Sequence, residues 1–416
     1  MDNLDYNQFS INIVGACMVM GLYMTLPVLG YLSDSHGPVL LAMISLILCP
    51  GYFLASAAYE YRLNYSWMCL AFFLIGCGTS SAYFCSLLTC AKIYPERKGL
   101  SISLPVTFYG LSSLVLANLF KLPVFQRTSG EIDILKVFTA LALLYLVLGI
   151  FNWISSIIVT IEKEVVYQKI QGESEQREED TEDDESTPLL NSQLLEPETQ
   201  GTKFRQFLSS PSTRLLYIAL FFLAGPLEIF VTNLGSLTVM VGDLSNKDVA
   251  TQVNYFSMFS TMTRLLMGAA TDLLGTIKAT TLLLVSGIAV ATLSFFLIAI
   301  DYSHFSVITS LVGIGYGSAF TLFPTLIATV WGVEILGSTW GLFLSAPAFG
   351  SLVFGMFYAF EFDTYCDISI TSWNVYCLTF PFALFAAGFA LSGVLLYLCW
   401  RLYWHTSRLT LENNEF

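Results

Sequence analysis

Charged residues are scarce in this chain of 416 residues, where they make up only 12% of the total. A soluble domain of this length would carry about 25%, so the composition excludes an ordinary water-soluble globular protein. Apolar residues reach 55% and recur in runs of about 20, long enough to cross about 30 Å of hydrocarbon as a helix. The alternating ~10-residue segments of a membrane β-barrel are missing. The sequence therefore predicts an all-α polytopic membrane protein.

Other shortages narrow the function. The nine cysteines show no metal-ligand spacing, and no nucleophile–base set lies in the apolar runs, so we expect no metal, no cofactor and no enzyme. The 18 Lys and Arg residues are scattered over loops, which argues against nucleic-acid binding. No pore-loop motif or ring of like charges indicates a channel. The first apolar run lacks the basic flank and cleavage site of a signal peptide.

Eleven apolar runs are long enough to span a membrane. We expect spans at 9–31, 38–59, 66–93, 98–120, 134–160, 213–242, 250–272, 278–300, 305–331, 336–360 and 374–402. They group into an N-terminal lobe of five spans (1–162) and a C-terminal lobe of six (213–404), followed by a tail (405–416). The segment 163–212 between the lobes is rich in Glu, Ser, Gln and Thr, which predicts a disordered acidic linker.

The sequence contains an internal repeat. The motif Gly-x3-Asp-x2-Gly occurs twice, 238 positions apart, at Gly30, Asp34 and Gly37 and again at Gly268, Asp272 and Gly275. The same offset relates Glu96 and Gly99 to Glu334 and Gly337. Parallel repeats of helical bundles are typical of secondary transporters, in which two lobes enclose a central site. Because the counterpart of 213–242 would fall upstream of Met1, we expect the first helix of the usual twelve to be missing. A gene model that starts late is favoured over a working eleven-span protein.

Basic residues set the expected orientation. If the linker lies in the cytosol, twelve Lys and Arg residues fall on the cytosolic side and five on the other, as the positive-inside rule requires. The remaining one, Arg264, falls inside a span. The linker and the C-terminus are then cytosolic.

The Gly-Asp-Gly motif resembles the major facilitator superfamily signature, Gly-x3-Asp-(Arg/Lys)-x-Gly-(Arg/Lys)2. The glycines and Asp34 match, but the three basic positions do not, and the second copy keeps only Lys278 nearby. A narrower resemblance is to the fungal Mch-type transporters, the vacuolar branch of the monocarboxylate-transporter homologues. It rests on the blocks 33–38, 87–92, 101–105 and 225–228. The resemblance implies a two-lobe major facilitator fold, twelve spans and a vacuolar membrane.

Asp34 and Asp272 end their helices, where a carboxylate opposes its own helix dipole and needs another partner. Pseudo-symmetry offers the start of a helix in the other lobe, near Leu336 for Asp34 and near Arg97 and Lys98 for Asp272. We expect such contacts to close the cytosolic side and to break on opening, a gating role that the superfamily resemblance also implies. The alternative is an ordinary solvated loop acid.

Glu228 and Arg264 are the strongest candidates for a solute or proton pathway. Glu228 follows Gly225-Pro226 in the middle of a span, where a charge costs roughly 2.5–3.5 kcal/mol and should face a cavity. Asn233 lies five residues further and could add an amide. Arg264 is the only basic residue within a span and could bind an anionic solute while Glu228 carries a proton. Alternatively the two form a structural ion pair, or Arg264 supports the Asp272 gate. Monocarboxylate transporters resemble this chain in having an Arg in the corresponding helix, but Ser260 replaces their acidic residue one turn earlier.

Three short signals lie outside the spans. Glu185, Leu189 and Leu190 resemble an acidic dileucine sorting signal, which would bind a vacuolar sorting adaptor. Cys366 and Cys377 could form a disulfide in an oxidising lumen or remain free thiols. Asn64 begins a glycosylation sequon close to two membrane ends.

Together these features predict a secondary active transporter that moves a small solute across the vacuolar membrane by alternating access, with or without coupling to protons, and that works as a monomer. The alternative is a non-transporting nutrient sensor or receptor that keeps the transporter fold.

Overall fold

The computed structural model describes residues 8–120, 122–127, 132–179, 199–241, 246–300, 303–365 and 376–405. All regular elements in these ranges are helical. In order they are α1 (Gln8–Tyr23), α2 (Leu26–His36), α3 (Val39–Ser45), α4 (Leu48–Glu60), α5 (Tyr65–Ile93), α6 (Lys98–Leu119), a 3-10 turn η1 (Pro123–Phe125), α7 (Ile134–Glu179), α8 (Gln200–Ser209), α9 (Pro211–Val241), α10 (Asn246–Leu274), α11 (Ile277–Ile300), α12 (Phe305–Trp331), α13 (Leu336–Phe343), α14 (Ser345–Tyr365), α15 (Tyr376–Cys399) and a π-helical turn η2 (Trp400–Trp404).

These helices make eleven passes, as the sequence predicts. Three passes are broken: α1 joins α2 just before Pro27, α3 joins α4, and α13 joins α14 just before Pro347. By length and composition, ten passes in the described residues could cross a membrane. The pass that fails the test is α10, which carries many Thr, Ser and Asn residues together with Arg264. It packs between α6 and α12, where neighbouring helices can satisfy its polar groups.

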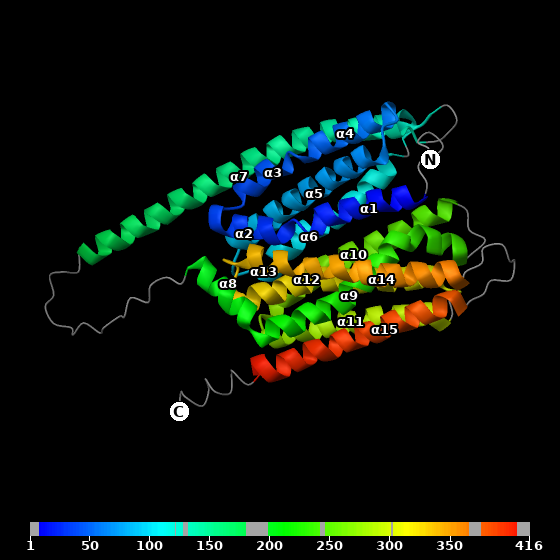
Figure 1. Cartoon of the computed structure of the whole chain (residues 1–416). Helices are drawn as coiled ribbons and strands as arrows, with labels where there is room; N and C mark the ends of the chain where they lie inside the picture. The colour runs from blue at the N-terminus through cyan, green and yellow to red at the C-terminus, as the bar shows by residue number, and fades with distance from the viewer. Residues whose placement is uncertain are drawn as a thin grey trace.

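The passes form two lobes (Figure 1). Helices α1–α7 make the N-terminal lobe and α9–α15 make the C-terminal lobe, with the lobes stacked one above the other in this view. Two helix pairs make most of the contact between them, α2 with α13 and α6 with α10, and α6 also contacts α12. Both pairs meet toward one end of the bundle, where α7 ends and α8 begins. We call this end the linker side.

Part of the predicted disordered linker is helical, so that prediction is wrong at both ends of the segment. α7 continues to Glu179, and α8 forms a separate ten-residue helix over Gln200–Ser209. The physical reason at the second end is amphipathicity: Phe207 is fully buried, while Arg205 and Leu208 face outward. The charge-rich composition of this segment does not show that Phe207 is buried against the rest of the protein.

A large core joins the lobes, and a smaller one lies within the N-terminal lobe. The large cluster is richest in C-terminal-lobe phenylalanines, where Phe295 contacts Phe389 at 4.7 Å and Phe382 at 5.3 Å between ring centroids. Aromatic pairs of this kind contribute roughly 0.5–1.5 kcal/mol beyond the area they bury. The smaller cluster centres on Ala55, Ala71 and Ile75 of α4 and α5.

Candidate functional site

Two equivalent contacts close the linker side between the lobes. The Asp34 carboxylate, at the end of α2, accepts hydrogen bonds from the backbone N–H groups of Gly337 (3.2 Å) and Ser338 (2.6 Å) in the first turn of α13. The Asp272 carboxylate, at the end of α10, accepts from Gly99 (2.6 Å) and Leu100 (2.8 Å) in the first turn of α6.

The first turn of a helix has N–H groups without intrahelical partners and carries the positive end of its dipole. A carboxylate placed there therefore forms charge-assisted hydrogen bonds. The two acids thus lie where the sequence prediction expects them, each at a helix start in the opposite lobe. We call these contacts the Asp34 gate and the Asp272 gate.

The motif glycines explain how the lobes come so close. A Cβ on Gly30 would overlap the Gly337 carbonyl, and one on Gly268 would overlap the Ser103 side chain. Only glycine lets the helix backbones cross at these two points. The last glycine of each motif has positive φ, 86° at Gly37 and 60° at Gly275, a region that L side chains rarely adopt. These two glycines end their helices directly after the acidic turn.

The Asp34 gate has donors that its counterpart lacks. The Ser338 hydroxyl donates to Asp34 at 2.8 Å, and the Lys92 ammonium lies 3.3 Å from the same carboxylate. Lys98, near the Asp272 gate, instead donates to the Ala328 carbonyl at 3.3 Å. The Asp34 side chain is completely buried, so each of these donors compensates part of the desolvation of its charge.

Glu228 lies between two tyrosines rather than against Arg264. Its Oε1 accepts hydrogen bonds from Tyr23 (2.8 Å) on α1 and Tyr316 (3.0 Å) on α12. The Tyr23 bond crosses from the N-terminal to the C-terminal lobe, while the Tyr316 bond stays within the C-terminal lobe.

Arg264 is 4% exposed and sits over the other side of the same tyrosine. Its guanidinium carbon is 5.6 Å from the Tyr316 ring centroid, a cation–π distance. Its Nη1 donates to the Val106 carbonyl of α6, across the lobe boundary. Its Nε has no partner among the described residues.

The direct Glu228–Arg264 ion pair is therefore wrong as a prediction. The described residues show no contact of that kind; each charge instead contacts Tyr316, Glu228 at the hydroxyl and Arg264 at the ring face. A narrow cavity of about 40 Å³ opens beside Arg264. Its lining includes Tyr23, Tyr83, Tyr109 and Tyr316 with apolar neighbours. The structure therefore places a buried cation with one unused donor beside a small cavity.

The structure does not bring Asn233 to this cavity. Its amide donates to the Ile229 carbonyl of its own helix at 2.9 Å and contacts the neighbouring Thr232 hydroxyl. At about 100° per residue, five residues carry the helix about 140° past one full turn. Asn233 therefore lies on a different face of α9 from Glu228.

Sequence analysis also missed residues that the structure assigns to the site. Tyr23 and Tyr316 belong to no motif. Lys92 lies five residues before Arg97 and Ser338 lies two residues after Leu336, and neither was predicted to bind Asp34. The available signal was Gly315-Tyr316-Gly317. A Cβ on Gly317 would overlap the Ser260 backbone of α10, and one on Gly315 would overlap Ala291 of α11. Gly317 is therefore the glycine of this pair that lets α12 approach the helix that carries Arg264.

Three further predictions fall where the structure says little. The sorting residues Glu185, Leu189 and Leu190 and the cysteine Cys366 lie outside the described residues, and the side chain of Cys377 is not described either. Asn64 is exposed directly before α5, and its glycosylation stays a prediction.

Comparison with known proteins supplies the family. The model described as "Major Facilitator Superfamily" matches residues 1–355. A "Probable transporter MCH1" from Wickerhamomyces anomalus is 41% identical, over 91% of this chain and 77% of that protein. The protein of the same name from Debaryomyces hansenii is 38% identical (96% and 86% covered), and that from Saccharomyces cerevisiae is 33% identical (94% and 85%).

Solved structures agree on the fold. The proton:xylose symporter XylE is 12% identical, with a TM-score of 0.65 over 96% of this chain and 88% of that one. The transporter FucP in its outward conformation is also 12% identical, with a TM-score of 0.59 over 96% and 92%. The two-lobe helical fold and the Mch-type resemblance that the sequence indicates are thereby confirmed. The chain belongs to the Major Facilitator Superfamily and, within it, to the fungal Mch-type transporters.

Proposed function

We propose that this protein is a secondary active transporter that moves a small anionic solute across the vacuolar membrane by alternating access, with proton coupling. In this proposal the linker and the C-terminus face the cytosol, as the distribution of basic residues favours. The observation that carries it is the pair of inter-lobe gates closing one side of the bundle, with Arg264 lining a central cavity and Glu228 bonded to two of the tyrosines that line it.

The two gates are the contacts that change when the lobes move. In the described structure α2 meets α13 and α6 meets α10 on the linker side, so this state is closed there. Rotation of one lobe against the other must break the bonds to Asp34 and Asp272 together, because each bond joins the two lobes. Two packed arrangements of the same interface, rather than gradual bending, are typical of such transitions.

Arg264 supplies the solute site. Arg264 lines the cavity, and its guanidinium has one neutral acceptor in Val106 and an Nε without a partner among the described residues. A carboxylate could satisfy the planar fork of donors in the bidentate manner that arginine favours. The four tyrosines lining the cavity offer hydroxyls and ring faces for the rest of a small organic anion.

Glu228 supplies the proton site. Ionised, it accepts the Tyr23 and Tyr316 hydroxyls in charge-assisted bonds, which are roughly twice as strong as neutral ones. Protonation weakens both bonds, and the Tyr23 bond is one that holds the lobes together. Proton binding on Glu228 would therefore loosen the central contact between lobes, which couples protonation to lobe movement.

The test uses the full chain in proteoliposomes that enclose a pH-sensitive dye. Pyruvate, 2-oxoglutarate and citrate are added one at a time under an imposed pH gradient. We expect one of them to cause solute-dependent proton movement, which Glu228→Gln abolishes and Arg264→Lys reduces at least tenfold. A Glu228→Gln protein with unchanged proton movement would remove Glu228 from the coupling role. Binding of solute with no flux by the wild-type chain would favour the nutrient sensor instead.

The vacuolar address is a separate part of the proposal. Support comes from the Mch-type relationship and from the dileucine pattern Glu185, Leu189 and Leu190, which would bind a sorting adaptor. Replacement of both leucines by alanine in a fluorescently tagged chain should move it from the vacuolar to another membrane. Unchanged vacuolar fluorescence would exclude this signal.

A further inference from the structure

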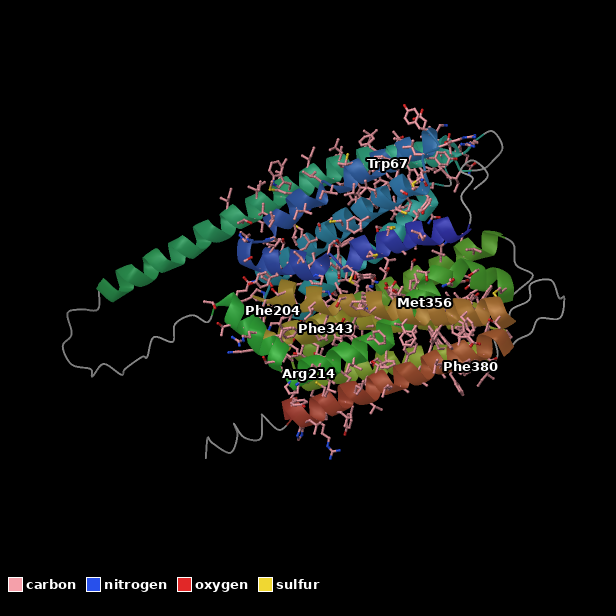
Figure 2. All side chains as sticks on the ribbon, in the orientation of Figure 1. Trp67, Phe204, Arg214, Phe343, Met356 and Phe380 are labelled. Atoms are coloured by element: carbon pink, nitrogen blue, oxygen red, sulfur yellow. The ribbon has the colours of Figure 1, made fainter. Side chains whose placement is uncertain are left out.

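The short helix α8 is anchored to the C-terminal lobe. Phe207 is fully buried and contacts Trp331 at 5.1 Å and Phe343 at 5.8 Å between ring centroids. The Thr213 hydroxyl donates to the Phe207 carbonyl at 2.7 Å, which fixes the end of α8 against α9. In Figure 2, Phe204 of α8 and Phe343 lie at the same end of the bundle, the linker side.

The same face of α8 also reaches the N-terminal lobe, because Phe204 stacks on Phe207 with ring centroids 5.9 Å apart. The Phe204 ring lies 5.8 Å from the ring of Tyr31 on α2. The Gln200 amide nitrogen donates to the Tyr31 carbonyl at 3.2 Å. The same nitrogen also donates to the Ser338 hydroxyl on α13 at 3.4 Å. Gln200 therefore touches both lobes with one atom.

These contacts surround the Asp34 gate. Tyr31 precedes Asp34 by three residues on the same helix, and Ser338 is one of the donors to the Asp34 carboxylate. When α2 moves away from α13, the Gln200 nitrogen cannot stay within hydrogen-bond distance of both. Since Phe207 holds α8 on the C-terminal lobe, the contacts to Tyr31 are the ones that must break.

We propose that α8 is a latch that holds the Asp34 gate shut, with Gln200 and Phe204 as gate-positioning residues. This inference rests on the proposed gating function and adds its regulation. The latch lies at the end of the 163–212 segment, so whatever pulls on or binds that segment acts on the gate through α8. Release of α8 from Tyr31 favours opening on the linker side while the Asp34 carboxylate itself is unchanged.

The test measures opening through a buried reporter. Ser103 on α6 is fully buried beside Gly268 in the other gate, so Ser103→Cys gives a thiol that a bulky charged maleimide reaches only when the lobes separate. Labelling of that position in the purified full chain is followed by peptide mass spectrometry, which distinguishes it from the native cysteines. The combined change Gln200→Ala with Phe204→Ala removes one shared hydrogen-bond donor and two aromatic pairs, those of Phe204 with Tyr31 and with Phe207. We expect labelling to become roughly tenfold faster.

The control is Leu208→Ala, on the same helix but 46% exposed, which should stay within about twofold of the parent. Asp34→Ala in the same background separates the two proposals. If Asp34→Ala speeds labelling and the α8 variant does not, the latch is overturned and the gates stand. If neither does, both fall.

A cross-link covers the case in which the α8 variant folds poorly. Tyr31→Cys with Phe204→Cys, oxidised to a disulfide, should slow labelling at position 103 at least fivefold, and reduction should restore the rate. An unchanged rate in the cross-linked protein would overturn the latch, because α8 would then be free to follow the opening lobe.

Discussion

The Asp34 and Asp272 gates come from one duplicated motif, yet they differ in the number of hydrogen-bond donors around the acid. Each acid takes two backbone N–H groups from a helix in the other lobe. Only Asp34 adds the Ser338 hydroxyl and the Lys92 ammonium. At the Asp272 gate, Leu100 stands where Ser338 stands in the other copy, and 238 positions after Lys92 the chain has Val330.

This difference shows how the two halves of a duplicated transporter can come to differ in their contacts. The backbone part of each gate survives any sequence change that keeps Asp and Gly, because it uses helix N–H groups. The side-chain part is free to diverge. We infer that the Asp272 gate opens more readily, with the Asp34 gate and its α8 cover as the stronger lock. Exchange of the Ser338 and Leu100 amide hydrogens reports on each gate separately.

The largest effect should come from removing the acids. Asp34→Ala leaves two N–H groups, a hydroxyl and an ammonium without their acceptor, whereas Asp272→Ala leaves two N–H groups. Because each buried donor left unsatisfied costs roughly 1–3 kcal/mol, we expect amide exchange at Ser338 to rise about 100-fold and that at Leu100 about tenfold. Hydrogen exchange with mass spectrometry measures both. Equal increases would break the comparison.

The helix crossings should show a smaller contrast. At Gly30 the new methyl of an alanine overlaps a backbone carbonyl, which cannot move alone, while at Gly268 it first meets the Ser103 side chain. Overpacking of this kind costs roughly 1–3 kcal/mol. We expect Gly30→Ala to raise exchange at Ser338 about tenfold and Gly268→Ala to raise exchange at Leu100 about threefold. The exposed Gly201 on α8, with open space around it, serves as a control for alanine itself.

Substitution of Tyr23 and Tyr316 tests whether the bond of Glu228 between the lobes, or its bond within one lobe, stabilises the closed gates. Tyr23→Phe removes a hydrogen bond between lobes, and Tyr316→Phe removes one within the C-terminal lobe. Because a hydrogen bond contributes roughly 0.5–1.5 kcal/mol, Tyr23→Phe should raise amide exchange at both gates about fivefold. Tyr316→Phe should leave it within twofold. If Tyr316→Phe loosens the gates as much, coupling through Glu228 does not depend on lobe contact.

The smallest and sharpest test makes one gate resemble the other. Ser338→Ala with Lys92→Met removes the two donors that the Asp272 gate lacks, and part of the Lys92 interaction is already screened by solvent. We expect exchange at Ser338 to rise about threefold, to the rate of Leu100 in the unmodified protein. Lys98→Met is the matched control, since Lys98 bonds to Ala328 rather than to Asp272. Ser338 exchange that stays slower in the double variant would show that α8 supplies the remaining difference.

The sequence alone predicted the number of passes and the positions of the two motif acids. The eleven apolar runs became eleven passes, and the motif spacing placed Asp34 and Asp272 at helix ends in matching positions. Periodic hydrophobicity and repeat offsets are properties of the chain itself, so they need no knowledge of the partner lobe. The same holds for Gly37 and Gly275, whose positive φ follows from ending a helix with glycine.

Only the tertiary structure decided which side chains meet. Successive residues point about 100° apart around a helix, so the sequence could place Glu228 and Arg264 in depth but not in direction. Tyr316 contacts both, Glu228 through its hydroxyl and Arg264 through its ring, because Gly313 and Gly317 let α12 approach α10 closely, which no spacing rule shows. Docking of α8 likewise depends on Phe207 finding Trp331 and Phe343, residues more than a hundred positions away that only folding brings together.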